Sequence, residues 1–384
     1  MTHGRRAAVL ALLRRVSRSE PVVVAEQELG GWWAPVTRLV FERDLPDVGP
    51  SVIVKTRRDG VVGWGDAEHF AGEQAALTLL GSSGLGPRLI AADDDEGVML
   101  LGDLGELPTV ESILLGRDRD RAIDALCGLA TTVGRLHAET VGRDEEHSAL
   151  RDSLGGRLAR PDRLGLWPGP DEWDAVEHAT RDLGFPDAGA ARDDANWLVE
   201  RLAEPAPFLA LSHPDPQPQN ALVASDHVAL VDFEGCAFRH TGTDAAFFQF
   251  PFPNYSAHWH TIPEDVKVLA DGHYRRELAA AVAAASDDET YAQVLAEGCG
   301  VALAVRVQRL PKLAQTDQSS AESWRRRAQL VQQIGVFIGV ARRAGCLSDL
   351  ADWFEDLAVA MADRWPDATH PAPTPFPAFC DSAD

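Results

Sequence analysis

The sequence lacks a long hydrophobic run: no stretch reaches the roughly 18 apolar residues that a membrane-spanning helix needs. The segment from Ala7 to Leu13 is apolar, but Arg14 and Arg15 interrupt it and no small-residue cleavage site follows. We therefore expect no membrane partner, and we interpret residues 1–18 as an N-terminal amphipathic helix rather than a signal peptide.

Cysteine is scarce and shows no pattern. The five cysteines are an odd number, and none forms a Cys-x-x-Cys pair. This spacing is typical of reduced thiols and gives no indication of a zinc site or a disulfide framework. We expect a cytoplasmic protein.

Basic residues are few relative to acidic ones. Lysine and arginine number 36, aspartate and glutamate number 59, and the net charge is −23. Nucleic-acid binding needs a basic surface, so this balance argues against a nucleic-acid partner. An acidic protein attracts cations, which is compatible with a cationic substrate. General acidity that serves solubility is the alternative interpretation.

The chain is long enough for two domains or lobes. It has 384 residues, 45% of them hydrophobic and 25% charged, which is ordinary for a globular protein with a large core. No internal repeat is evident.

The segment from Leu211 to Glu234 carries the most informative pattern. Two short apolar runs, 221–223 and 228–231, flank a polar turn, which predicts a β-hairpin. Asp215 and Asn220 precede the hairpin and Asp232 follows it. Carboxylate and amide oxygens are ligands that Mg²⁺ accepts, together with phosphate and water. The sequence therefore predicts a magnesium site at the open end of this hairpin.

This segment resembles the catalytic and metal loops of the aminoglycoside phosphotransferase / choline kinase family. The resemblance rests on His213-x-Asp215-x(4)-Asn220 and on Asp232-Phe233-Glu234. It implies an α+β, two-lobed protein-kinase-like fold, with a small antiparallel β N-lobe and a large, mainly helical C-lobe. It also implies the transfer of a γ-phosphate to a hydroxyl group.

Three positions depart from the family's pattern. Pro214 stands where the family usually has Gly, Gln217 where it has a second His, and Gln219 where Gly is common. The acid, the amide and the second acid of the pattern are kept. We expect Pro214 and Gln217 to alter the shape of the loop or its contacts with substrate.

Lys55 ends an apolar strand, and a helical pattern that includes Glu73 follows it. Glu73 lies on the same stripe as Phe70 and Leu77, where a carboxylate is costly unless it is paired. We therefore predict a Lys55–Glu73 ion pair. The resemblance implies that Lys55 binds the α- and β-phosphates of a nucleotide.

The nucleotide site is otherwise marked only weakly. The turn at Gly30 and Gly31 does not match Gly-x-Gly-x-x-Gly; the resemblance implies that it is a loose version of the family's phosphate-binding loop. The strand 98–101 leads to Gly102 and Leu104, whose backbone groups the resemblance assigns to the nucleotide base. We predict a nucleotide-binding lobe over residues 1–104 and a catalytic and substrate-binding lobe over 105–384.

The second predicted lobe is helical. Apolar residues recur at helical spacing over 122–141, and this helix includes His137, for which we expect a structural role. Residues 142–205 are interpreted as the family's variable insertion, with helices near 171–183 and 191–203. The resemblance implies that Asp244 supports the catalytic loop through hydrogen bonds.

The resemblance implies a division of roles within the site. Asp215 orients the acceptor hydroxyl and takes its proton, while Asn220 and Asp232 hold Mg²⁺. The co-substrate is ATP or GTP. Glu234 and Gln217 are predicted substrate contacts, Glu234 because a ribbon would point it in the same direction as Asp232.

Three functions remain open at this point. The first is a phosphotransferase that modifies an aminoglycoside-type or other antibiotic. The second is a metabolic kinase for a sugar, amino sugar, amino alcohol or nucleoside. The third is a nucleotide-binding pseudokinase, suggested by Pro214 and Gln217. The acceptor in the first two is a small molecule, and we expect a monomer or homodimer.

Overall fold

The structure is a computed structural model that describes residues 3–30, 35–57, 67–154, 170–250, 260–315, 321–366 and 374–380. The chain divides into two compact units. Unit 1 comprises Met1–Thr109, Arg143–Leu158 and Asn220–Ala237, and unit 2 comprises Val110–Gly142, Ala159–Gln219 and Phe238–Asp384. The predicted lobes, 1–104 and 105–384, stay a prediction. The two compact units interleave along the sequence, because two later segments pack with the N-terminal residues.

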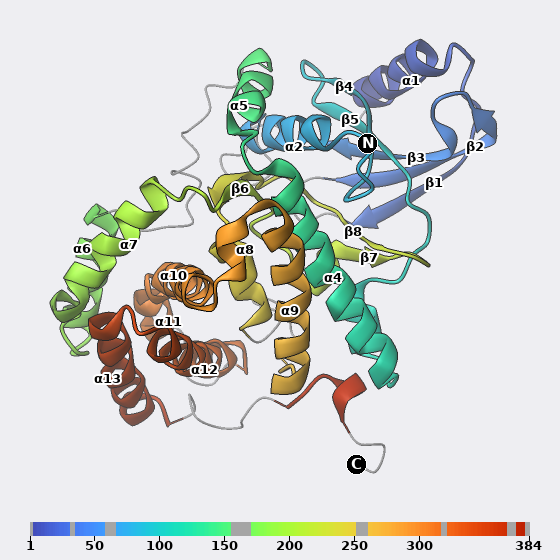
Figure 1. Ribbon diagram of the computed structural model, residues 1–384. Helices are drawn as coiled ribbons and strands as arrows, with labels where there is room; N and C mark the ends of the chain where they lie inside the picture. The colour runs from blue at the N-terminus through green and yellow to red at the C-terminus, as the bar shows by residue number, and fades with distance from the viewer. Residues whose placement is uncertain are drawn as a thin grey trace. The chain divides into compact units, whose positions relative to one another are not determined.

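Unit 1 is built on a five-stranded antiparallel sheet with the order β1-β2-β3-β5-β4 (Figure 1). The strands are β1 (Val23–Gly30), β2 (Val36–Leu45), β3 (Gly49–Thr56), β4 (Leu89–Asp93) and β5 (Val98–Gly102). The antiparallel sheet expected near the N-terminus is therefore present. The central strands β3 and β5 pair from Val52 with Gly102 to Thr56 with Val98.

Helix α1 (His3–Ser17) covers one face of this sheet. Leu12 and Leu13 of α1 pack in one core cluster with Val52 and Val54 of β3. Side chains of a strand alternate between its faces, so Lys55, the next residue, faces the opposite side. Helix α2 (Ala67–Leu80) supplies the partner for Lys55 there.

Two later segments complete unit 1. Helix α5 (Asp144–Ser153) packs against α2, and Arg143 donates a hydrogen bond to the Leu79 carbonyl at 3.1 Å. Strands β7 (Ala221–Val223) and β8 (Val228–Leu230) form the predicted hairpin. The Val223 N–H bonds to the Pro108 carbonyl at 2.9 Å, which ties this hairpin to the end of the N-terminal segment.

Unit 2 is mainly helical. Its helices are α3 (Val110–Leu114), α4 (Arg119–Thr140), α6 (Pro170–Asp182), α7 (Arg192–Ala203), α8 (Gly242–Ala245), α9 (Glu264–Ala281), α10 (Asp288–Val307), α11 (Leu310–Gln315), α12 (Ala321–Ala344) and α13 (Ser348–Arg364). Strands β6 (Leu209–Ser212) and β9 (Ala237–His240) pair with each other. The long helix predicted over 122–141 is α4, and the two helices predicted in the insertion are α6 and α7.

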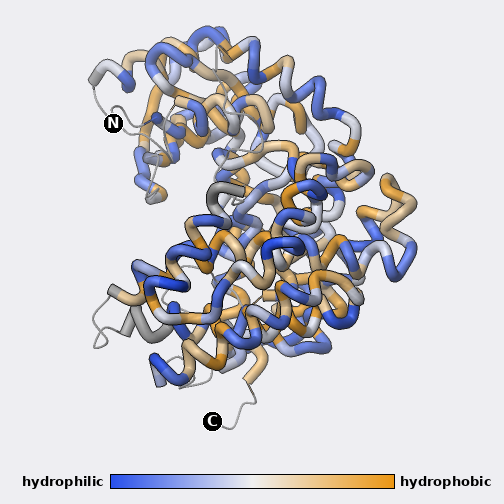
Figure 2. The backbone as a smooth tube through the Cα atoms, turned by 90° about the vertical axis from the view of Figure 1, so that its left-hand side faces the viewer, coloured by the Kyte–Doolittle hydropathy of each residue, from blue (hydrophilic) through white to orange (hydrophobic). Residues whose placement is uncertain are grey.

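The packing of unit 2 follows from amphipathic helices. Helix α4 starts at an N-cap, where the Asp118 side chain accepts from the Arg121 N–H at 3.0 Å, and it packs along α9. Hydrophobic and hydrophilic stretches alternate along the described backbone (Figure 2). Of the helices that the structure describes, none is both long and apolar enough to cross a membrane.

Candidate active site

Lys55 and Glu73 form the ion pair that the sequence predicts. The Lys55 Nζ lies 2.6 Å from Glu73 Oε2, and the Glu73 side chain is only 1% exposed. Glu73 reaches the lysine because it lies on the buried face of α2, beside Ala76 and Leu77. A carboxylate at such depth is tolerated only with a partner, and Lys55 supplies the opposite charge.

Two further carboxylates surround the same ammonium group. Asp232 Oδ1 lies 2.6 Å and Glu234 Oε2 lies 3.3 Å from Lys55 Nζ. One oxygen each from Glu73, Asp232 and Glu234 can be chosen so that all three lie within 4.8 Å of one another. Three carboxylates thus face one lysine, which leaves an excess of negative charge. Hard oxygen ligands with this charge fit a divalent cation such as Mg²⁺.

Burial and charge compete in setting the pKa values of this cluster. Burial lowers the pKa of Lys55, but the three carboxylates more than offset it, and the pKa is raised above its ordinary value. Burial raises the pKa of Glu73, with Lys55 acting in the opposite direction. Burial also raises the pKa of Glu234, to about 7, again against the effect of Lys55.

The loop after β8 brings Asp232 and Glu234 to the lysine. Asp232 has a left-handed backbone with φ of 68°, a conformation that Asp accepts more readily than most residues. The Val231 N–H bonds to the Asn220 carbonyl at 2.9 Å, which holds Asn220 at the open end of the hairpin. Asn220 and Asp232, the predicted metal ligands, therefore flank the same end of the β7–β8 ribbon.

Glu234 lies beyond the strands of the hairpin. Strand β8 stops at Leu230, and the chain turns so that the Cys236 N–H bonds to the Phe233 carbonyl at 3.0 Å. Strand alternation therefore does not set the direction of Glu234, and its assignment as a substrate contact stays a prediction. Its carboxylate is 5% exposed and faces Lys55.

The tight approach of a neighbouring segment helps to fix this loop. The Leu230 N–H bonds to the Leu85 carbonyl at 2.8 Å. A Cβ on Gly86 would lie 2.6 Å from Cε2 of the buried Phe233, so only glycine fits without a shift. The Gly86-Pro87 turn is thus part of the support for the loop that carries Asp232.

In unit 2, Asp244 supports the loop that carries Asp215, as predicted. The Ser212 hydroxyl donates to Asp244 Oδ1 at 2.7 Å, and the His213 N–H donates to Oδ2 at 2.8 Å. All three side chains are buried. Burial raises the pKa of Asp244, but hydrogen bonds from His137, Ser212 and His213 outweigh it, and the pKa is lowered.

His137 has the structural role expected for it. Its Nε2 lies 3.1 Å from Asp244 Oδ2, and its Nδ1 lies 2.8 Å from the Tyr274 hydroxyl. Helices α4 and α9 thereby share a buried polar link to Asp244, which supports the loop that carries Asp215. The contribution of Tyr274 was not evident from the sequence, because a tyrosine on an amphipathic helix carries no distinguishing pattern.

Helix α10 passes very close to α8, the helix that carries Asp244. A Cβ on Gly298 would collide with the Gly242 carbonyl. A glycine is therefore required at position 298, and this close contact helps to fix the position of α8 against α10.

Gln217 bonds to Asp215, which the sequence did not reveal. The Gln217 Nε2 donates to Asp215 Oδ1 at 2.6 Å, and the Gln217 residue is completely buried. Tight turns precede it, with the Asp215 N–H bonded to the His213 carbonyl at 2.7 Å. The side chain predicted as a substrate contact is thus directed at the candidate base. Pro214 in this loop has a positive φ of 29°.

The predicted nucleotide contacts are placed as follows. Gly30 ends β1 with φ of 97°, whereas Gly31 lies outside the described residues. The Gly102 N–H already bonds to the Arg88 carbonyl at 2.8 Å, so it is not available to a nucleotide base. Leu104 is half-buried in the segment after β5. Lys55, Glu73, Asn220, Asp232 and Glu234 belong to unit 1, and Asp215 and Gln217 to unit 2.

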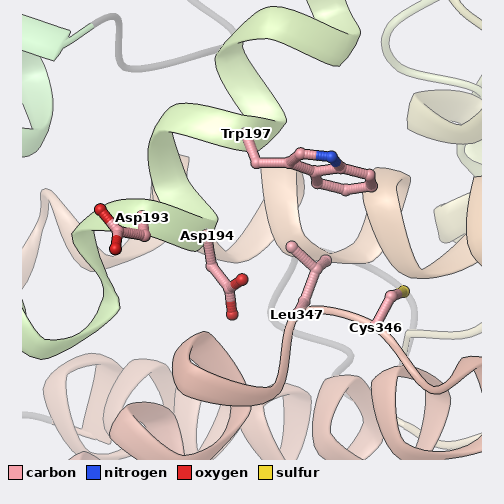
Figure 3. Close-up of a pocket in the computed structure, with 5 residues that line it drawn as sticks. All are labelled: Asp193, Asp194, Trp197, Cys346 and Leu347. Carbon is pink, nitrogen blue, oxygen red and sulfur yellow. The ribbon is translucent and has the colours of Figure 1, made fainter.

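A cavity of about 310 Å³ lies in unit 2 between α7 and the turn from α12 to α13 (Figure 3). Its lining comprises Asp193, Asp194, Trp197, Cys346 and Leu347. Asp194 already accepts a hydrogen bond from the Leu350 N–H of α13 at 2.9 Å. The acid therefore has a structural task at a helix N-terminus.

Comparisons with known proteins identify the fold. No protein-family model matches the sequence, and no curated protein matches it. Among solved structures, the chain is similar to a choline kinase from Cryptosporidium parvum Iowa II, with a TM-score of 0.52 and 12% identity over 91% of this chain and 99% of that one. This likeness shows the α+β fold of the protein-kinase-like small-molecule kinases, as expected.

Two further solved structures are similar at lower scores. A choline kinase from Streptococcus pneumoniae gives a TM-score of 0.48 and 14% identity over 88% of this chain and 100% of that one. An ADP-bound aminoglycoside phosphotransferase gives a TM-score of 0.47 and 12% identity over 92% of this chain and 99% of that one.

Proposed function

We propose that this protein is a small-molecule phosphotransferase that moves the γ-phosphate of ATP or GTP to a hydroxyl group. The observation that carries the proposal is the cluster around Lys55. One buried lysine is fixed by Glu73 and faces Asp232 and Glu234, at 2.6 and 3.3 Å. A cation-binding acid next to a held lysine is what the binding of a magnesium–triphosphate complex requires.

The proposal assigns a task to each group. Lys55, held by Glu73, would neutralise the α- and β-phosphates. Asn220 and Asp232 would hold a magnesium ion, which would supply positive charge to stabilise the phosphates. Asp215 accepts the proton of the acceptor hydroxyl. Catalysis then comes from positioning and charge stabilisation, without a covalent intermediate on the protein.

For the acceptor, the net charge of −23 supports a cationic molecule. We propose an aminoglycoside-type or other antibiotic, which would make the protein a resistance enzyme. A metabolic kinase for an amino alcohol or sugar is the second candidate, supported by the fold shared with the Cryptosporidium choline kinase. Retention of Lys55, Glu73, Asp215, Asn220 and Asp232 argues against a pseudokinase.

The experiment measures nucleotide consumption by the purified protein with ATP or GTP, MgCl₂ and a panel of acceptors. The panel contains aminoglycosides, other hydroxyl-bearing antibiotics, amino alcohols and sugars. Expression in a sensitive bacterial host, with the minimum inhibitory concentration of each drug as readout, separates the first candidate from the second. Magnesium-dependent nucleotide binding with no turnover in any panel would favour the pseudokinase and contradict the proposal.

A further inference from the structure

The segment that follows β5 is fastened to the sheet by a buried ion pair. Arg38 of β2 donates to Asp103 from Nε at 2.7 Å and from Nη2 at 3.0 Å, in the two-pronged geometry that suits arginine and carboxylate. The side chains are only 10% and 6% exposed. The pair therefore joins an inner strand of the sheet to the segment predicted to contact the nucleotide base.

Further hydrogen bonds extend the Arg38–Asp103 pair to both sides of Leu104, and we call this set of contacts the Arg38–Asp103 clamp. The Ser51 hydroxyl donates to Asp103 Oδ2 at 2.6 Å, and the Gly105 N–H donates to Oδ1 at 2.8 Å. Arg38 Nη2 also donates to the Gly105 carbonyl at 2.9 Å. Arg38 of β2 thus holds the residues before and after Leu104, and Ser51 of β3 holds the residue before it.

The carboxylate of Asp103 has no capacity left for a ligand. A carboxylate has about four lone-pair positions, and Asp103 accepts four hydrogen bonds from Arg38, Ser51 and Gly105. Burial raises the pKa of Asp103, but these bonds outweigh it, and the pKa is lowered. Asp103 is therefore built to stay charged and to hold its neighbours.

Leu104, between the clamped residues, differs from its neighbours. Among the described residues, neither its N–H nor its carbonyl takes part in a hydrogen bond. Buried or half-buried backbone groups are normally paired, so a held residue with both groups unused is a candidate for a polar ligand. One donor and one acceptor on the same residue match the hydrogen-bonding edge of a purine.

We propose that Arg38 and Asp103 are positioning residues that hold the Leu104 backbone for the purine base of the nucleotide. This inference rests on the proposed function and deepens it. Without the clamp, Leu104 would have to be ordered when the nucleotide binds, and that cost would be subtracted from the affinity. The clamp acts on the base alone, so it leaves the binding of the phosphates unchanged.

The experiment compares two probes by titration calorimetry: magnesium–ATP and magnesium–tripolyphosphate, which lacks the base. We expect Arg38→Met to weaken ATP binding about 5- to 20-fold, the effect of one or two lost hydrogen bonds, with tripolyphosphate affinity unchanged. In steady-state assays, the KM for ATP should rise by a similar factor while kcat stays the same. Arg14→Met is the matched control, because Arg14 pairs with Glu20 on the exposed face of α1.

Removal of Arg38 leaves the Asp103 charge unpaired, so Arg38→Met combined with Asp103→Asn provides a second variant for the same titrations. Unchanged ATP affinity in both variants, or a parallel loss of ATP and tripolyphosphate, overturns the inference. Wild-type protein that binds both probes equally tightly also overturns it, because the base then contributes nothing. Wild-type protein that binds neither probe overturns the proposed function as well.

Discussion

The side-chain amide of Gln217 donates a hydrogen bond to the carboxylate of Asp215 at 2.6 Å, from a completely buried position. The bond selects one orientation for the candidate base. We predict that Gln217→Leu lowers kcat by about fivefold, since one directed hydrogen bond is worth about 1 kcal/mol, and leaves the KM of the acceptor unchanged. Steady-state kinetics would check this. A rise in acceptor KM at constant kcat would instead support the substrate contact predicted from the sequence.

Lys55 is surrounded by the three carboxylates of Glu73, Asp232 and Glu234. Lys55→Met should destabilise the protein by about 3–5 kcal/mol, because buried charge is left without a partner. Added MgCl₂ should restore part of this loss, since a divalent cation can replace the ammonium group. Thermal unfolding with MgCl₂, against NaCl at equal ionic strength, measures the effect. A variant whose Tm responds equally to both salts would show that the cluster does not take the metal.

Glu234 gives the stability a defined pH dependence. Burial raises its pKa from 4.5 to about 7 in the folded protein. An acid with a raised pKa stabilises the fold while it is protonated, so its contribution is present below pH 4.5 and is lost as the pH rises through 7. The loss is on the order of 3 kcal/mol at most.

Glutamine at position 234 cannot titrate, so the Glu234→Gln variant should not show this loss of stability as the pH rises. Urea unfolding at pH 5 and pH 8 should therefore show a smaller drop in the free energy of unfolding for Glu234→Gln than for wild type. The exposed Glu204 provides the control in Glu204→Gln. If Glu234→Gln and the wild type lose equal stability over this interval, the raised pKa is wrong.

Much of the fold followed from local patterns. The strand that contains Val52 and Val54, and the helical stripe that contains Glu73, were readable because period-two and helical spacing are set by the backbone. The Lys55–Glu73 pair followed from the cost of a buried charge. The interleaving of the two units was not predictable from such patterns, because it depends on which distant segments pack together.

In the candidate site, too, local sequence patterns did not show which residues contact each other. The side chain of Gln217 points at Asp215 and Glu234 at Lys55 because of turns whose directions depend on tertiary contacts. The Arg38–Asp103 clamp joins residues 65 positions apart, and nothing in either local sequence marks it. Spacing in a sequence identifies which residues carry chemistry more readily than it identifies their partners.

Pro214 has a positive φ of 29°, whereas the proline ring favours a value near −65°. We predict that Pro214→Gly raises the free energy of unfolding by up to about 2 kcal/mol, because relief of about 1–3 kcal/mol of backbone strain outweighs the cost of a more flexible unfolded chain. Pro216→Gly is the matched control, since Pro216 has no positive φ, and it should lose about 0.5–1 kcal/mol because glycine makes the unfolded chain more flexible. Chemical denaturation measures the change in the free energy of unfolding for each variant. A loss of stability in both variants would contradict the claim that Pro214 is strained.

The central claim is that Asp215 accepts the proton in a phosphoryl transfer supported by the Lys55 cluster. Its most direct test is single-turnover transfer of labelled γ-phosphate to the acceptor found in the panel, with wild type, Asp215→Ala and the exposed control Asp226→Ala. We predict a rate about 10²- to 10⁴-fold lower for Asp215→Ala, as loss of a general base implies, with unchanged nucleotide affinity and an unaffected control. Transfer by Asp215→Ala at the wild-type rate would contradict the account.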